Sequence, residues 1–196
     1  MNRIHRLGMV AALYVLASCG DPVGSGEPGW LRASLSGAVS GSYQGTGDFL
    51  DQANREVGPR RMFSVVSTTA GPNPESFSFY RQNGNRPAVG TYQLELVDQS
   101  DFKAVGFFAF YTRATSDRVE SFVAQSGEVV ITRSTSNRVE GTFRFVGFRY
   151  CAIPRTGNGQ EGPCSPPATA LVGAPTVEVS GSFSVAPDDG DDMLPM

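Results

Sequence analysis

The stretch TVEVSGSFSV, residues 176–185, alternates between apolar and polar positions along its whole length. Val177, Val179, Gly181, Phe183 and Val185 share one face, and the other face carries Thr, Glu and Ser side chains. Alternation with period two is typical of a β-strand that buries one face and exposes the other to water. This stretch therefore indicates an antiparallel sheet with one wet face.

The same pattern recurs through most of the chain, and long helical patterns are absent from the sequence. Roughly ten short strands separated by turn residues predict an all-β fold, either an antiparallel β-sandwich or a closed barrel-like sheet. The segments predicted as strands are 31–35, 38–43, 62–68, 76–81, 90–96, 103–112, 119–123, 127–133, 137–145 and 176–185.

Two stretches are nearly identical: RATSDRVESF from Arg113 and RSTSNRVEGTF from Arg133. Both lie between alternating segments, and their centres combine Ser and Thr with Asp or Asn, which favour turns because their side chains bond nearby backbone groups. A calcium-binding loop would need more carboxylates than Asp117 and Glu120 supply. The repeat is therefore interpreted as two successive β-hairpins.

A Val-x-Gly-Ser/Thr-aromatic pattern occurs three times, at Val39–Tyr43, Val139–Phe143 and Val179–Phe183. A glycine between two inward positions leaves room for a neighbouring ring or a sharp bend, so the pattern indicates packing units of one sheet. In FRFVGFRYC, residues 143–151, the apolar positions change from odd to even numbers, which predicts a β-bulge around Gly147.

The most apolar part of the mature chain is DFKAVGFFAFYTR, residues 101–113. One interpretation is a central strand covered on both sides. The other is an exposed aromatic platform for a glycan or a protein partner. The residues of this candidate binding surface are Phe107, Tyr111, Phe148 and Tyr150.

The first residues have the order of an export signal. Arg3 and Arg6 precede an apolar run over 7–16, which is shorter than the roughly 20 residues that span a bilayer. The quartet LASC, residues 16–19, resembles the lipobox of bacterial lipoproteins, although an ordinary signal peptide with a cysteine near its cleavage site is an alternative.

In that family the cysteine thiol carries diacylglycerol and the new amino group carries a fatty acyl chain such as palmitate. The resemblance therefore implies lipid attachment at Cys19 and anchoring in the cell envelope. In that family an Asp directly after the cysteine retains the protein at the inner membrane. Here Gly20 occupies that place and Asp21 comes one place later, so the resemblance favours the outer membrane over the inner one where both exist. The mature part is similar to small all-β envelope lipoproteins of unknown function, a likeness that brings no catalytic residues.

Composition and the signal-like N-terminus divide the chain into four predicted regions. The predicted regions are a lipoprotein signal peptide (1–18), the lipidated cysteine with a Gly- and Pro-rich flexible tether (19–29), an all-β domain (30–186) and an acidic mobile tail (187–196). Loss of the signal leaves 14 basic and 19 acidic residues, a net charge of −5 that argues against binding to nucleic acid.

The only histidine, His5, lies in the signal, so the mature chain has no Ser–His or Cys–His catalytic arrangement and no histidine-ligated metal site. No metal site and no cofactor are expected. Cys151 and Cys164 flank a polar, Gly- and Pro-rich segment, and in an oxidising compartment such a pair predicts a disulfide rather than a redox or metal site.

These features predict a non-catalytic binding or structural role in the envelope, with a glycan or another envelope protein as the partner. The alternative is a histidine-free hydrolase that uses two carboxylates on an envelope polysaccharide. Sequence spacing alone singles out no such pair of acids.

Overall fold

A computed structural model describes residues 27–51, 62–82, 85–96, 106–155 and 171–188. Nine β-strands run through these residues, and no helix among them is long and apolar enough to cross a membrane. The strands are β1 (Trp30–Gly37), β2 (Gly41–Asp51), β3 (Met62–Thr68), β4 (Glu75–Gln82), β5 (Gly90–Gln93), β6 (Phe108–Ala114), β7 (Arg118–Ser134), β8 (Val139–Pro154) and β9 (Thr176–Pro187).

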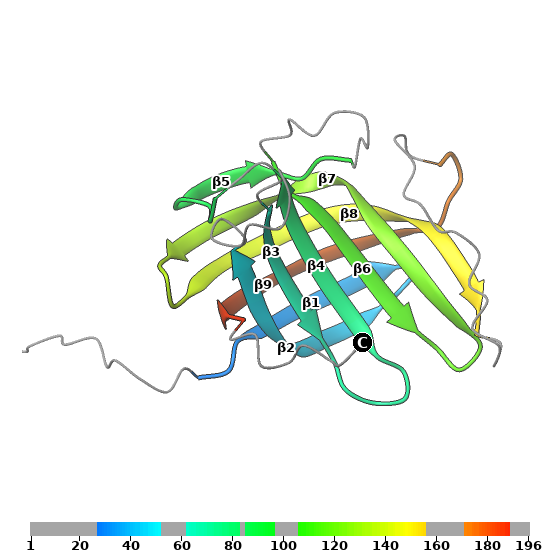
Figure 1. Cartoon of the computed structure of the whole chain (residues 1–196). Helices are drawn as coiled ribbons and strands as arrows, with labels where there is room; N and C mark the ends of the chain where they lie inside the picture. Colours follow the sequence, from blue (N-terminus) through cyan, green and yellow to red (C-terminus); the bar gives the residue numbers. More distant parts are fainter. Residues whose placement is uncertain (1–26, 52–61, 83–84, 97–105, 156–170, 189–196) are drawn as a thin grey trace, which may run out of the picture.

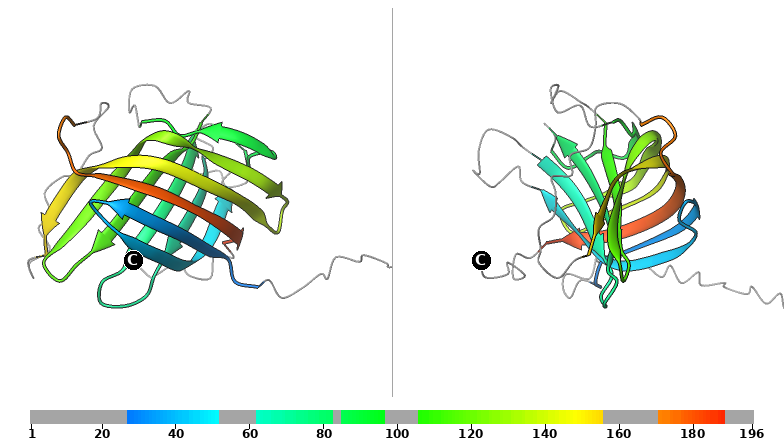
Figure 2. Two further views of the ribbon diagram at one scale, coloured as in Figure 1. Left: turned by 180° about the vertical axis from the view of Figure 1, so that it is seen from behind. Right: turned by 90° about the vertical axis from the view of Figure 1, so that its right-hand side faces the viewer.

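Eight of the strands close into an antiparallel barrel (Figure 1). Apart from β5, each strand pairs with the next one along the chain, and the pairing of β1 with β9 closes the ring. The ninth strand, β5, pairs with the half of β7 that extends past β6, as Figure 2 shows from two further sides. The predicted all-β fold is confirmed, and of its two forms the structure has the barrel.

Aromatic rings fill the inside of the barrel. Phe77 and Phe79 of β4 contact Phe143 of β8 across the interior, with ring centroids 5.9 and 4.8 Å apart. Phe79 also reaches Phe183 of β9 at 6.2 Å. An eight-stranded barrel has an interior just wide enough for side chains, and here the rings occupy it, so the wall rather than the lumen is accessible to a ligand.

Two glycines of β8 and β9 make room for rings on the opposite strand. Gly141 pairs with Phe183, and Phe143 pairs with Gly181. A Cβ atom on Gly141 would lie 2.9 Å from the Phe183 ring, and one on Gly181 would lie 2.5 Å from the Phe143 ring. Two of the three Val-x-Gly-aromatic segments therefore pack reciprocally, as predicted. Gly41, in the third, has no neighbour within 4 Å of such a Cβ.

The duplicated sequence forms two hairpins with the same turn, which confirms the prediction. The amide of Thr115 donates to the carbonyl of Arg118 at 2.8 Å, and that of Thr135 donates to Arg138 at 2.9 Å. In both turns the threonine hydroxyl also accepts from the backbone amide of the arginine, at 3.2 and 3.0 Å.

The two copies nevertheless face opposite sides of the barrel wall. Strand β7 joins two segments that were predicted as separate strands, and its register with β8 skips Gln125 and Thr132. Each skipped residue is a β-bulge that shifts the alternation by one. The bulge at Gln125 reverses the inward positions of β7, and the bulge at Thr132 restores them. Arg133 lies thirteen residues after the inward-facing Glu120, an odd number of steps, so the second copy starts from an outward position. Glu120 therefore faces inward after the first turn, whereas Val139 faces inward and Glu140 outward after the second.

The predicted bulge around Gly147 is therefore wrong in its position. Gly147 keeps the inward phase of Phe143 and Phe145, and the nearest irregularity lies opposite it, at Gln125 of β7. On β8 itself the register skips Tyr150. The alternation predicted that Phe148 faces inward because it is apolar. Its ring is buried, but it lies on the outer face of the wall.

Candidate functional site

The four aromatic residues of the predicted binding surface do not form an exposed row. Phe107, Tyr111 and Phe148 are at most 1% exposed, and only Tyr150 is half-buried. Phe107 and Tyr111 belong to the interior, where the Tyr111 ring stacks on Phe77 at 4.8 Å. The burial agrees with the first interpretation of this segment, a strand covered on both sides, because alternate residues of 107–111 enter a core that has space for large rings.

Phe148 and Tyr150 lie on the outer side of the wall. The ring of Phe110 contacts both Tyr80 and Tyr150, with centroids 5.9 and 6.4 Å apart. Burial raises the pKa of the Tyr150 hydroxyl. The rings of Tyr80, Phe110 and Tyr150 pack on one another and are each half-buried, so they form an aromatic cluster rather than an open platform.

Other predicted site residues lie partly outside the described ranges. Cys151 is a buried residue of β8. Cys19, Cys164, residues 19–26 of the predicted tether and residues 189–196 of the predicted tail fall outside the described residues. The last tether residue, Gly29, accepts from the amide of Gly47, and Asp188 of the predicted tail donates its amide to Phe49 on β2. Lipid attachment and the Cys151–Cys164 bridge therefore stay predictions.

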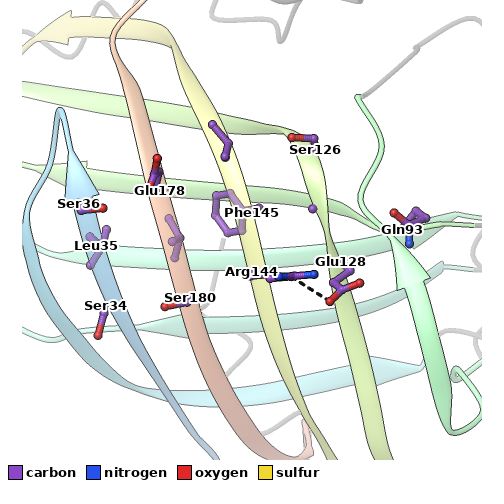
Figure 3. Close-up of a pocket in the computed structure, with 13 residues that line it drawn as sticks. Ser34, Leu35, Ser36, Gln93, Ser126, Glu128, Arg144, Phe145, Glu178 and Ser180 are labelled. Carbon is purple, nitrogen blue, oxygen red and sulfur yellow. Dashed lines mark hydrogen bonds and ion pairs between the residues drawn. The ribbon is translucent and has the colours of Figure 1, made fainter.

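A groove of about 520 Å³ crosses the outer wall of the barrel over β1, β9, β8 and β7 and reaches β5 (Figure 3). We call it the transverse groove. Its outward-facing side chains are polar apart from one valine: Ser34, Ser36, Gln93, Ser126, Glu128, Arg144, Val146, Glu178 and Ser180. A second hollow of about 400 Å³ adjoins it and shares Glu128, Arg144 and Ser180.

Strand register arranges these side chains in two rows across the strands. The first row runs Ser34, Ser180, Arg144, Glu128, Gln93, because each residue pairs with the next on the adjacent strand. The second row runs Ser36, Glu178, Val146, Ser126 by the same pairings. Between them lies a row whose side chains point inward and whose backbone forms the floor: Leu35, Val179, Phe145 and Gly127.

The end of the groove at β7 depends on the bulge at Gln125. The bulge sets Ser126 and Glu128 outward and places Gly127 on the floor, opposite Phe145. Gly127 has φ +144°, and a Cβ there would lie 2.2 Å from the carbonyl oxygen of Arg144. Only glycine fits this position, so the local sequence keeps β7 and β8 closely paired at the floor.

The charges in the transverse groove are one neutralised pair and one further carboxylate. The Arg144 guanidinium donates to Glu128 across the strand pair at 2.9 Å. Glu178 is exposed, and its side chain has no hydrogen bond or ion pair within the described residues. The groove therefore carries a net charge of −1, with its excess charge on β9.

A second polar cluster lies inside one end of the barrel. Glu120, which is 4% exposed, accepts from Arg113 Nε at 2.7 Å and from Arg149 Nη1 at 2.6 Å. Burial opposes ionisation of this carboxyl, but the hydrogen bonds from Arg113 and Arg149 outweigh it and lower its pKa. Both carboxylate oxygens are bound by arginine, so this cluster closes the barrel end and leaves Glu120 no free oxygen for acid–base chemistry.

Two tyrosines lie near this end. Tyr43 shares a hydrogen bond of 2.9 Å with the Ser67 hydroxyl, and burial raises its pKa to about 12. Burial also raises the pKa of Tyr111, helped by the negative charge of Glu75. Both phenols are therefore neutral over the physiological range and act as packing groups.

Within the described residues, no group of three or more His, Cys, Asp or Glu side chains could hold a metal ion. The sequence did not indicate the transverse groove. The residues that line it come from five strands, and the register of strand pairing is what brings them together. The polar faces of two predicted strands hold the sequence signal for the groove. The face of 31–35 has Arg32 and Ser34 and continues to Ser36, and the face of 176–185 has Glu178 and three serines.

No family model, no curated protein and no solved structure matches this chain. Its function must therefore be inferred from its own residues.

Proposed function

We propose that this chain is a lipid-anchored protein of the bacterial cell envelope that binds an envelope component through the transverse groove without catalysing a reaction. The lipobox-like LASC quartet supports the anchor. In bacterial lipoproteins the residue after the cysteine bears on the choice of membrane, and Gly20 at this position favours the outer membrane in cells that have one. Strand β1 begins at Trp30, so 19–29 would serve as the tether between the lipid and the barrel.

The observation that carries the binding role is the double row of polar side chains on paired strands. Each strand under the groove is held by backbone hydrogen bonds to its neighbours, so the rows keep their geometry without a ligand. A site that is already formed loses little entropy when a ligand binds. The net charge of −5 predicted for the mature chain argues against nucleic acid as the ligand.

Two carboxylates in one groove, Glu128 and Glu178, are the observation that favours the alternative of a hydrolase. Glycosidases of this kind need one carboxyl that is kept protonated, usually by apolar surroundings. Glu128 is paired with Arg144, and Glu178 is open to water. Neither carboxylate lies in the apolar surroundings that such a site uses, so binding is the better supported role.

The test is capture of labelled, solubilised envelope components by the full chain, purified in detergent and immobilised. Ser180→Tyr would fill the centre of the groove from an exposed position, whereas Gln44→Tyr adds the same ring to an exposed site on β2 outside it. We expect the wild type and Gln44→Tyr to retain the same component and Ser180→Tyr to lose it. Retention of nothing, or equal retention by all three chains, would reject the proposal.

The enzymatic alternative is tested with the same material. Release of soluble sugar from envelope polysaccharide by the wild type, abolished in Glu128→Gln or Glu178→Gln, would establish a hydrolase. We expect no such release.

A further inference from the structure

We infer that the ligand of the transverse groove is an extended glycan chain, neutral or positively charged, which lies across the strands between the two polar rows. This inference rests on the proposed function, because it takes the groove as the binding site. Dimensions, hydrogen-bonding groups and charge each contribute to it.

The groove has the dimensions of a trough for one chain. Outward residues two apart on a strand are separated by about 6.7 Å, so the two rows form walls at that spacing with backbone between them. Along the groove, four steps between neighbouring strands at about 4.8 Å each, from Ser34 to Gln93, give roughly 19 Å. A narrow trough of this length fits an extended oligomer better than a compact small molecule.

The walls offer hydrogen-bonding groups suited to hydroxyls. Ser34, Ser36, Ser126 and Ser180 can each donate and accept, Gln93 adds an amide, and Glu178 adds a carboxylate that accepts only. A sugar hydroxyl also donates and accepts, so successive hydroxyls of a glycan can pair with side chains along both rows.

A peptide fits this groove less well. An extended peptide usually binds by adding a strand to a free sheet edge. Strands β1, β9, β8 and β7 under most of the groove are each paired on both sides. Among the described strands that the groove touches, a sheet edge occurs at β5, at one end of it. A peptide lying across these strands would leave its own amides and carbonyls without backbone partners.

Charge narrows the class of glycan. Arg144 is neutralised by Glu128, and Glu178 is the carboxylate of the groove whose side chain has no partner among the described residues. A chain of phosphates or uronic acids would meet this carboxylate with repulsion. An amino group on the sugar would form a charge-assisted hydrogen bond with it, which is stronger than a neutral one.

The experiment is calorimetric titration of the full chain in detergent with three probes. They are the tetramer of N-acetylglucosamine, the same tetramer without acetyl groups, which is positively charged, and a tetramer of galacturonic acid, which is negatively charged. We expect the deacetylated tetramer to bind about ten-fold more tightly than the acetylated one, because it gains a bond to a charged group. The galacturonic acid tetramer should not bind.

Two variants assign the effect to the groove. Glu178→Gln should remove the ten-fold preference for the deacetylated tetramer, whereas Glu140→Gln, which removes a carboxylate on the same outer face outside the groove, should preserve it. Ser180→Tyr should abolish binding of both sugars. Because the groove spans several strands, the deacetylated dimer should bind at least ten-fold more weakly than the tetramer.

The outcomes separate this inference from the proposed function. Capture of an envelope component that Ser180→Tyr abolishes, together with no binding of either glucosamine probe, would overturn the glycan assignment and leave the groove as a binding site. Tighter binding of the galacturonic acid tetramer, or a preference unchanged in Glu178→Gln, would also overturn it. Loss of the capture result itself would reject the proposed function.

Discussion

Glu120 and Glu140 follow the same turn sequence and meet opposite environments. Glu120 is buried between Arg113 and Arg149, whereas Glu140 lies on the outer face, 3.7 Å from Arg133. The Arg and Glu of each copy are seven positions apart in the chain, so sequence gives no reason to distinguish them. Burial distinguishes them. Breaking the ion pair of a buried carboxylate destabilises the fold strongly, whereas breaking that of an exposed one costs little.

We predict that Glu120→Gln lowers the free energy of unfolding by about 3 kcal/mol, since it leaves two arginines without their shared carboxylate inside the barrel. Glu140→Gln is the matched control in the second copy, and its effect should be below about 0.5 kcal/mol. Urea unfolding of both variants at neutral pH measures the difference. Equal losses would show that the inner pair contributes no more than the surface pair.

Glu120 also makes the free energy of unfolding depend on pH. The pKa of Glu120 is lowered in the folded state from its ordinary value of 4.5, so its contribution to stability is fully present above that pH. It is lost as the pH falls below 4.5 through the lowered pKa. The wild type should therefore lose stability in this acid range, and Glu120→Gln should show a shallower loss. Parallel curves for the two proteins would assign the acid sensitivity to other carboxylates.

At the scale of the element, Gly127 allows β7 and β8 to pair closely on the floor of the groove. It has the same φ as Gly41, +144°, but only Gly127 has close neighbours. Alanine at either position meets the same backbone strain, and at Gly127 its Cβ also meets the Arg144 carbonyl and Phe145. The comparison of the two variants therefore isolates the steric conflict at the floor of the groove.

We predict that Gly127→Ala is less stable than Gly41→Ala by about 1–3 kcal/mol, the usual cost of forcing extra atoms into a packed site. The added methyl group should push β7 away from β8 at this point. Glu128 and Ser126 would move with β7, so capture of the envelope component should weaken. Urea midpoints and the capture experiment, run side by side, check both parts. Equal midpoints would mean that β7 can move away from β8 without loss.

The elements themselves could be predicted because alternation and turn chemistry are local. The hairpins at Thr115 and Thr135 follow from short polar residues between apolar runs, and β3 begins and ends where the pattern does. The bulges at Gln125 and Thr132 could not be predicted, because they depend on the partner strand. Between these two bulges the inward positions of β7 are reversed, which also decides which of its side chains line the groove.

The candidate site was harder to predict than the fold, and for a related reason. Large aromatic side chains such as Phe107 and Tyr111 suggested an interface, but the same rings fill a barrel interior once the sheet closes. Closure is a property of the whole sheet. The groove residues Ser34, Glu128 and Ser180 look ordinary in the sequence, and they become neighbours only through three strand registers.

At the scale of the whole molecule, the proposed binding role depends on where the barrel is held. A closed wall leaves a groove on its outer side, and a flexible tether would let that side meet a polymer near the membrane. Two or three acyl chains on one cysteine would make the anchor stable, because each buried methylene contributes about 0.8 kcal/mol. Lipidation of Cys19 is thus the feature that would convert weak binding in the groove into lasting contact with an envelope surface.

We predict that the mature protein begins at Cys19 and carries diacylglycerol and an amide-linked acyl chain. Intact-mass analysis of membrane-extracted protein measures both features at once. Cys19→Ser should lack the added lipid mass, whereas Ser25→Ala, a change in the tether outside the LASC quartet, should keep it. A wild-type protein that begins at another residue, or that begins at Cys19 without lipid, would contradict the anchor. The groove would then have to hold its ligand by its own affinity, without the high local concentration that attachment to the membrane provides.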